Sequence, residues 1–264
     1  KDNKLKGKIE FKNLNFAYNE KKGDVLKDIN LVINPGETVA FMGTVGSGKS
    51  TVSNLLIRLF DTPERGQLLI DDMDIADIPL KTLRGNIGYI PQDNFLFSDT
   101  IRYNIGFSPD EMNDEQIEEA AKTSDIYDTI MDLPDQWETM LGEKGVNLSG
   151  GQKQRMCIAR AVAKNAPIMI FDDCLSAVDM ETESRILKSL KDVQSKRTCI
   201  IIAHRISTVK DSDKIVVLHK GRVAEVGTHE ELLEKQGYYY KSYRIQLLEQ
   251  QYGVGLKDAK GEKK

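Results

Sequence analysis

Apolar residues form several short continuous runs along this chain, and stretches with helical spacing separate them. The runs at 38–42, 168–171 and 198–203 consist almost entirely of apolar residues. Continuous runs of this length are typical of strands that are buried on both faces. Buried strands that alternate with helices predict a layered α/β core whose sheet is mostly parallel.

Shorter patterns predict further strands and turns around this core. Residues 9–18 alternate aromatic or aliphatic positions with polar ones, as a half-buried strand does. Further strands are expected at 25–33 (closed by the turn at 34–36), 68–70, 73–75 and 87–90, and as a hairpin at 214–218 and 222–226. Residues 230–243 have the spacing of a terminal helix.

The stretch between about residues 95 and 165 is dominated by helical spacing. Its clearest helix is Asp114–Thr123, because Asn113 before it and Gln116 three residues later match an N-terminal cap. This block, at about 93–165, therefore looks like a helical insertion into an α/β core at about 8–92 and 166–248.

Composition restricts the class of protein. The 264 residues are 40% hydrophobic and 30% charged, enough for a core in one large or two small domains. A formal net charge of −4 gives no sign of a nucleic-acid partner. Cys157, Cys174 and Cys199 lack C-x-x-C spacing, so we expect reduced, buried side chains in a cytosolic setting. No apolar run approaches the ~20 residues that cross a bilayer.

The strongest chemical signal is a glycine-rich segment between the strand at 38–42 and a helix expected at 51–60. It has the pattern G-x-x-x-x-G-K-[ST] and consists of Gly43, Thr44, Val45, Gly46, Ser47, Gly48, Lys49 and Ser50, followed by Thr51. Its glycines let backbone N–H groups converge on phosphate oxygens, and the helix N-terminus favours the same anion. Lys49 is then placed to reach the β- and γ-phosphates, and Ser50 to bind Mg²⁺. The alternative is a plain turn between a strand and a helix.

Two adjacent carboxylates follow the buried strand at 168–171. A carboxylate at this end of a core strand lies beside the ligand site of an open α/β sheet. We therefore expect Asp172 to bind Mg²⁺, directly or through water. Asp173 comes next and could orient or deprotonate an attacking water. The alternative is a pair of acidic residues that merely ends a strand.

A second glycine-containing segment opens a helix that extends to about Ala163. It consists of Leu148, Ser149, Gly150, Gly151 and Gln152. Ser149 and Gln152 have the spacing of a capping box. Glycines in the first turn leave backbone N–H groups uncovered, so this N-terminus can receive an anion. An ordinary capped helix is the structural alternative.

These segments, in this order, resemble the nucleotide-binding domain of an ATP-binding cassette (ABC) transporter. The resemblance covers residues 9 to about 243, and Leu148–Gln152 is its most specific part. It implies a P-loop NTPase core with a mostly parallel sheet, an N-terminal antiparallel β subdomain and an inserted α-helical subdomain. It also implies an ATPase with Mg²⁺ as cofactor.

The resemblance carries site roles to matching positions. Tyr18 is similar to the aromatic residue that stacks on adenine. Gln92 matches the glutamine that contacts Mg²⁺ and water, and His204 matches the histidine that contacts the γ-phosphate. The loop that crosses between subunits corresponds to Ser176, Ala177, Val178 and Asp179. Each has a structural alternative: a core aromatic, a loop amide, a strand-end histidine and a plain turn.

In this family two such domains pack head to tail. Each ATP then lies between the phosphate loop of one domain and the Ser149-type helix of the other. We expect a second, different domain of this kind as partner, a missing transmembrane domain joined through residues 1–7, and a position on the cytoplasmic face of the cell membrane.

Residues 249–264 are expected to be a disordered tail. The segments at 95–102 and, more weakly, 141–145 resemble those that contact the membrane domain of exporters; local packing is the alternative for 95–102.

One position departs from the family pattern. Glutamate usually follows the metal-binding aspartate, but this chain has Asp173. The carboxylate should fall about 1 Å short of the water, and such a displacement can cost about 10²-fold in rate. We therefore expect slow hydrolysis at this chain's own site, as in the degenerate half of a heterodimeric multidrug exporter. Backbone compensation that lets aspartate work is the alternative.

Two other functions stay open at this stage. One is a soluble ABC ATPase that acts on DNA or the ribosome, although the chain shows no paired cassette, coiled coil or basic surface. The other is a regulatory half-site that mainly holds ATP. The transported substrate is not encoded in this segment.

Overall fold

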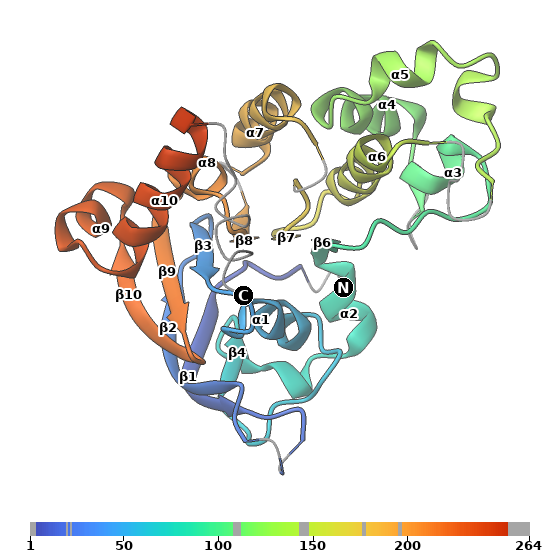
Figure 1. Ribbon diagram of the computed structural model, residues 1–264. Coiled ribbons are helices and arrows are strands. Elements are labelled where there is room, and N and C mark those ends of the chain that lie inside the picture. The colour runs from blue at the N-terminus through green and yellow to red at the C-terminus, as the bar shows by residue number, and fades with distance from the viewer. Residues whose placement is uncertain are drawn as a thin grey trace.

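The computed structural model describes residues 4–19, 21, 23–107, 112–142, 148–175, 178–194 and 197–252. Its elements, in chain order, are β1 (Ile9–Phe16), β2 (Leu26–Ile33), β3 (Thr38–Gly43), α1 (Lys49–Leu56), β4 (Leu68–Ile70), β5 (Met73–Asp74), the 3₁₀ turn η2 (Ile75–Asp77), α2 (Leu80–Gly85), β6 (Ile87–Ile90), α3 (Ile101–Gly106), α4 (Asp114–Thr123), α5 (Tyr127–Met131), the 3₁₀ turn η3 (Gln136–Glu138), α6 (Gly150–Ala163), β7 (Ile168–Asp172), α7 (Met180–Gln194), β8 (Thr198–Ile202), α8 (Ile206–Val209), β9 (Lys214–His219), β10 (Arg222–Gly227), α9 (His229–Lys235) and α10 (Tyr238–Tyr252). Figure 1 shows their arrangement.

The larger sheet of the described residues has six strands in the order β10-β9-β3-β8-β7-β6. All of its pairs are parallel except β10 with β9. Every residue of β7 and β8 is buried, as the continuous apolar runs predict. Met169 and Phe171 pack into one core cluster with α6 and α7, while Ile168 and Ile170 pack into the other with α1. The central strands are apolar throughout because both faces are covered.

The second sheet of the described residues has four antiparallel strands in the order β2-β1-β4-β5. Its apolar side chains, such as Phe11 and Leu14, share a core cluster with Val39 and Phe41 of β3. This sheet therefore lies against the same face of the larger sheet as α1. The expected P-loop core with an antiparallel β subdomain is confirmed.

Helices fill the chain between β6 and β7, where the insertion is expected. Ile117, Ala120 and Ala121 of α4 share a buried cluster with Met156 of α6. In Figure 1 the helices α3 to α6 form a lobe on the opposite side of the molecule from β1 and β2. The caps of α4 and α6 are both complete capping boxes, as their sequences predict.

The helix after the phosphate loop is shorter than expected and begins earlier. It spans Lys49–Leu56 instead of 51–60. Arg58 then has a positive φ of 48°, which turns the chain away from the helix axis. Leu59, which falls within the expected helix, lies beyond the actual one and is 56% exposed.

The expected single C-terminal helix at 230–243 is wrong, because the chain forms α9 and α10 instead. Gln236 adopts the left-handed conformation that ends α9. Glu225 of β10 then accepts hydrogen bonds from the first backbone N–H groups of α10, at Tyr238 and Tyr239. Residues 249–252, expected to belong to a disordered tail, are the last turn of α10, and 253–264 lie outside the described residues.

The N-terminal segment, expected to be a linker over 1–7, is fixed to the domain from Leu5 onwards. Leu5 is buried, and its N–H donates to Asn86 Oδ1 at 3.0 Å. The carboxylate of Asp71 accepts hydrogen bonds from three successive backbone N–H groups, at Lys6, Gly7 and Lys8. Residues 1–3 lie outside the described part of the chain. Among the described helices, none combines the length and the apolar character needed to span a bilayer.

Candidate functional site

One cavity of about 490 Å³ collects residues from distant parts of the chain. It is lined by Tyr18, Val25, Gly43, Val45, Gly46, Gly48, Lys49, Ser50, Thr51, Gln92, Asp172, Asp173, Ile202, Ala203 and His204. The carboxyl ends of β3, β7 and β8 open into it, which is where ligands of open α/β sheets bind. The fold thus brings the expected phosphate loop, metal ligand, catalytic residues and adenine-stacking residue together.

The phosphate loop has a backbone that only glycine tolerates at two positions. Gly43 has φ 151°, and a Cβ there would lie 2.3 Å from the carbonyl oxygen of Leu218. Gly48 has φ 104°, and a Cβ there would lie 2.6 Å from a methyl group of Leu26. The loop is therefore held against β9 and β2, with its backbone close to the cavity.

Lys49 lies at the start of α1 and turns back over this loop. Its Nζ donates to the carbonyl oxygens of Gly43 at 2.7 Å and Thr44 at 2.9 Å. Burial lowers the pKa of Lys49, while the carboxylates of Asp173 and Asp172 act in the opposite direction. A phosphate would offer this ammonium a stronger, charge-assisted partner than two neutral carbonyl groups.

The other loop residues differ in exposure. Thr44 and Val45 are exposed, whereas Ser47 is buried beneath the loop with a hydroxyl that has no hydrogen-bond partner among the described residues. Ser50 is exposed at the cavity, and Thr51 accepts a hydrogen bond at 3.0 Å from the hydroxyl of Tyr18.

Asp172 ends β7 with its carboxylate buried beside α1. Its Oδ2 accepts hydrogen bonds from Ser53 Oγ at 2.6 Å and Tyr89 Oη at 3.3 Å. Its Oδ1 is buried and has no hydrogen-bond partner among the described residues. Burial raises the pKa of Asp172, because the charged form loses its water. A buried carboxylate with one unused oxygen is the kind of donor that suits a divalent cation, so the residues here fit the expected Mg²⁺.

Ser53 and Tyr89 were not predicted from the sequence, although both orient Asp172. Ser53 lies one helical turn after Ser50, and that spacing is the only signal that could have pointed to it. No local pattern marks Tyr89, since β6 and β7 become neighbours only in the folded sheet. Burial raises the pKa of the Tyr89 hydroxyl to about 12, so it stays a hydrogen-bond donor.

Asp173 and His204 form a pair at the ends of neighbouring strands. His204 Nδ1 and Asp173 Oδ1 are 3.0 Å apart. The hydrogen bond that His204 donates to the Asp173 carboxylate raises the pKa of His204. Asp173 has a left-handed backbone with φ 47°, so its side chain does not follow the alternating pattern of strand β7. A non-glycine residue in this region carries strain, and such strain concentrates at functional positions.

Tyr18 lies beyond the end of β1, and its side chain is 48% exposed at the cavity. Phe16 and Phe60 support its ring edge to face, with centroids 5.0 and 4.8 Å away. The alternative of a fully buried core aromatic is therefore wrong. Gln92 is also exposed at the cavity, two residues after β6.

The Leu148–Gln152 segment lies outside this cavity. Ser149 Oγ accepts from the N–H of Gln152 at 3.2 Å, and Gln152 Oε1 accepts from the N–H of Ser149 at 2.9 Å. Leu148 is buried, whereas Ser149 and Gly150 are exposed and Gly151 is half-buried. One chain therefore does not bring this helix end to its own phosphate loop.

The expected subunit-crossing loop is only partly described. Asp179 accepts a hydrogen bond from the N–H of Thr182 at 2.9 Å and so caps α7. This backbone hydrogen bond lowers the pKa of Asp179. Val178 is buried. Ser176, Ala177 and residues 143–145 lie outside the described residues.

The segment at 95–102 begins an exposed aromatic cluster in the helical lobe. Phe95, Phe97, Tyr103 and Phe107 are in ring contact, and all except Phe97 are largely exposed. Arg160 of α6 lies over the Phe97 ring. Local packing thus accounts for Phe97 but leaves much of the other rings exposed.

Known proteins resemble this chain over most of its length. The model of a family described as ABC transporter matches residues 26–176. The uncharacterized ABC transporter ATP-binding protein YknU of Bacillus subtilis is 49% identical over 92% of this chain, which covers 41% of that protein. A putative multidrug export ATP-binding/permease protein of Staphylococcus aureus is 48% identical, with 92% of this chain and 42% of that protein covered.

A solved structure gives the same result in three dimensions. The structure of a bacterial Atm1-family ABC exporter with ATP bound superposes with a TM-score of 0.88 and 42% sequence identity. The match covers 94% of this chain and 43% of that one. The chain thus spans about two fifths of the length of the relatives it matches.

Proposed function

This chain belongs to the ABC transporter family as an ATP-binding domain, and from that premise we propose that its ATPase activity powers export across a membrane. The single observation that carries this proposal is the cavity in which the phosphate loop, Asp172, Asp173, Gln92 and His204 meet. The printed names of its relatives, which include export ATP-binding/permease proteins, support the direction of transport.

ATP would be bound mainly through its phosphates. The loop at 43–50 would supply backbone N–H groups, and Lys49 would exchange its carbonyl partners for phosphate oxygens. Tyr18, at the rim of the cavity, would stack on adenine. Mg²⁺ would be held by Ser50, Gln92 and the unused oxygen of Asp172, and it would neutralise charge on the phosphates.

Hydrolysis needs a positioned water. The water oxygen would form a bond to the γ-phosphorus, the bond to the bridging oxygen of ADP would break, and a water proton would pass to a nearby base. Asp173 would be that base, and its carboxylate lies 3.0 Å from Nδ1 of His204. His204 would also donate toward the γ-phosphate through its other ring nitrogen.

We propose further that this site turns over slowly. Asp173 is one methylene shorter than the glutamate usual in this family, so its carboxylate lies closer to the backbone. The hydrogen bond with His204 would hold the carboxylate at that position. The intact Ser149 cap would instead serve the ATP of a second domain. That second domain would be a different chain with a complete catalytic site, as in a heterodimeric exporter.

The proposed setting is the cytoplasmic face of a cell membrane, next to a transmembrane domain. The domain would comprise about residues 8–248, with residues 1–7 leading from the membrane domain. The exposed rings of Phe95, Tyr103 and Phe107 would lie at the surface that contacts it. The substrate of the transporter is determined by that other domain.

A second candidate function is favoured by the same Asp173. A domain that binds ATP and hydrolyses it poorly can act as a regulatory half-site, which mainly holds two domains together. Phosphate release from this chain alone and from a mixture with its partner domain would separate the two, since a regulatory half-site raises the partner's rate without turning over itself.

Isothermal titration calorimetry of this chain with MgATP-γ-S, a slowly hydrolysed analogue, tests the common basis of these proposals. Lys49→Ala should raise the dissociation constant about 10- to 100-fold, because a charge-assisted contact contributes roughly 1.5–3 kcal/mol. Lys122→Ala removes an exposed lysine that pairs with Glu118 and lies over the Tyr127 ring, outside the cavity lining, and should stay within about twofold. Absence of binding heat from the folded parent chain would contradict the proposal.

A further inference from the structure

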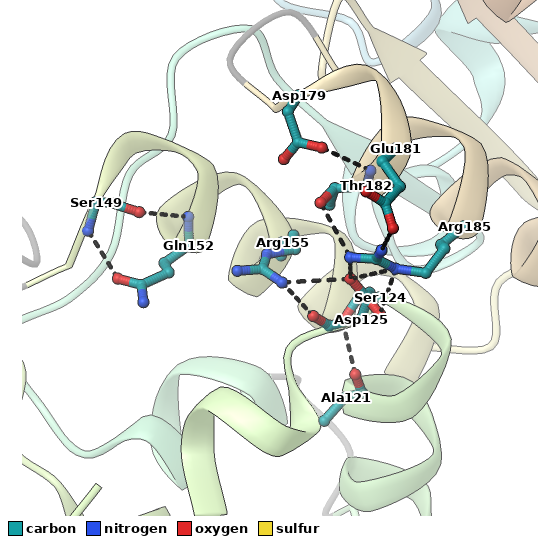
Figure 2. A network of polar contacts seen from close by, with 10 residues as sticks. All are labelled: Ala121, Ser124, Asp125, Ser149, Gln152, Arg155, Asp179, Glu181, Thr182 and Arg185. Atoms are coloured by element: carbon teal, nitrogen blue, oxygen red, sulfur yellow. Dashed lines mark hydrogen bonds and ion pairs between the residues drawn. The ribbon is translucent and has the colours of Figure 1, made fainter. Parts of the chain in front are cut away.

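Asp125 joins two helices that both lead to the surfaces expected to face a second domain. It follows directly after α4 and Ser124, in the left-handed conformation with φ 58°. Figure 2 shows it between α6 and the first turn of α7, at the centre of a continuous set of polar contacts. None of these residues lines the nucleotide cavity.

On one side Asp125 holds the helix that begins at the Ser149 cap. Arg155 lies one turn after Gln152 on α6. Its Nη1 donates to the backbone carbonyl of Asp125 and approaches Oδ2 of the same residue at 3.4 Å. A shift of α6 along or about its axis would break both contacts.

On the other side Asp125 holds the beginning of α7. Arg185 donates from Nη2 to Asp125 Oδ2 at 3.0 Å, and its Nε lies 3.3 Å from the same oxygen. Arg185 also donates to Glu181 at 3.0 Å and to Thr182 Oγ1 at 3.1 Å. The N–H of Thr182 is in turn bonded to Asp179, the described end of the expected subunit-crossing loop.

We propose that Asp125 is a positioning residue that fixes the Ser149 end of α6 relative to the Asp179 end of α7, so that both meet the nucleotide-bearing face of a second domain together. This inference rests on the proposed sharing of ATP between two domains. An isolated exposed ion pair would carry little consequence. Here one carboxylate accepts from guanidinium groups of two separate helices. Its loss releases Arg185 on α7 and leaves Arg155 on α6 only its contact with the backbone carbonyl of Asp125.

The test measures association and nucleotide binding separately. This chain has an intact phosphate loop and an intact capped α6, so two copies should pair in MgATP when hydrolysis is slow. Analytical ultracentrifugation in MgATP gives the concentration of half-association, and calorimetry with MgADP gives binding to the chain's own loop. Asp125→Ala and Arg185→Met should each raise the half-association concentration on the order of tenfold. MgADP affinity should stay within about twofold.

Two features separate positioning from a general loss of structure. Glu118→Gln removes the charge of an acid on the neighbouring helix α4, together with its ion pair to Lys122, and it should associate like the parent. The double variant Asp125→Ala/Arg185→Met should be no worse than either single one, because groups that act as a unit are non-additive. Should Asp125→Ala fail to fold, Asp125→Asn and Arg185→Met carry the test.

The possible failures are distinguishable. A parent chain that binds MgADP but associates in MgATP neither with itself nor with its partner domain overturns the sharing of ATP, and this inference with it. A parent that associates, with Asp125 and Arg185 variants that associate equally well, overturns this inference alone. Variants that lose MgADP affinity in proportion to association show a merely structural role and also overturn it.

Discussion

At the scale of single residues, the proposed chemistry of this domain depends on two neighbouring carboxylates with different surroundings. Asp172 is buried, and its pKa is raised by the loss of water. Asp173 turns out of the strand through a left-handed backbone and pairs with His204. Adjacent residues thus have different surroundings because the backbone changes conformation between them: one carboxylate is bonded to Ser53 of α1 and the other pairs with His204.

Asp173→Glu is expected to raise ATP turnover at this site by about 10- to 100-fold, because the longer side chain restores the reach of the carboxylate toward the attacking water. Phosphate release at saturating MgATP, by this chain and by the full-length transporter, measures the effect. Asp61→Glu, at an exposed position, adds the same methylene and should leave the rate unchanged. An unaltered rate in Asp173→Glu, or a parent rate that is already high, would show that aspartate is sufficient here.

At the scale of elements, the phosphate loop and α1 act as one unit whose geometry is set by their neighbours. Gly48 caps α1 with a left-handed backbone, and Leu26 of β2 lies directly against it. The N-terminus of α1 consequently points its free N–H groups into the cavity. A side chain at Gly48 would have to displace either β2 or the loop.

Gly48→Ala is expected to lower the free energy of unfolding by about 1–2 kcal/mol through backbone strain alone, and to weaken MgADP binding by more than tenfold because the loop must move. Thermal or urea unfolding and calorimetry measure the two effects. Gly85→Ala is the matched control: this glycine lies in α2 without positive φ, and a Cβ there meets nothing within 4 Å. It should be neutral or slightly stabilising. Normal MgADP affinity in Gly48→Ala would refute the role given to this glycine.

At the scale of the whole molecule, single buried contacts tie segments that are far apart in the sequence. Thr198 opens β8 and is fully buried. Its hydroxyl donates to the carbonyl oxygen of Gly7 at 2.8 Å and accepts from the N–H of Gly36 at 3.1 Å. The N-terminal segment, the turn between β2 and β3 and the central sheet therefore meet at one side chain.

Thr198→Val keeps the shape of this side chain and removes the partner of the buried Gly7 carbonyl and of the Gly36 N–H. It is expected to lower the free energy of unfolding by about 1–3 kcal/mol, measured by urea denaturation. Thr62→Val is the control, since the half-buried Thr62 makes no side-chain hydrogen bond within the described residues, and it should change stability by less than about 0.5 kcal/mol. Equal stability of the two variants would mean that this junction contributes nothing.

The sequence by itself determined what depends on near neighbours. The capping boxes of α4 and α6, the buried strands β7 and β8 and the glycines of the phosphate loop follow from residue types a few positions apart. The motif also named six of the residues that line the cavity, since a G-x-x-x-x-G-K-[ST] loop works only between a buried strand and a helix. The sequence predicted the ends of helices less well. Arg58 and Gln236 have left-handed backbones that turn the chain, although the apolar spacing of the sequence continues past them.

Only the tertiary structure decided which distant groups meet. Ser53 and Tyr89 orient Asp172, Asp125 bridges α6 and α7, and Asp71 fixes the N-terminal segment because sheet pairing and helix packing bring them within hydrogen-bond reach. These contacts join positions tens of residues apart, and no period of 2 or 3.6 records them. Local patterns specify elements, whereas the directions of side chains at long range follow from packing the whole core.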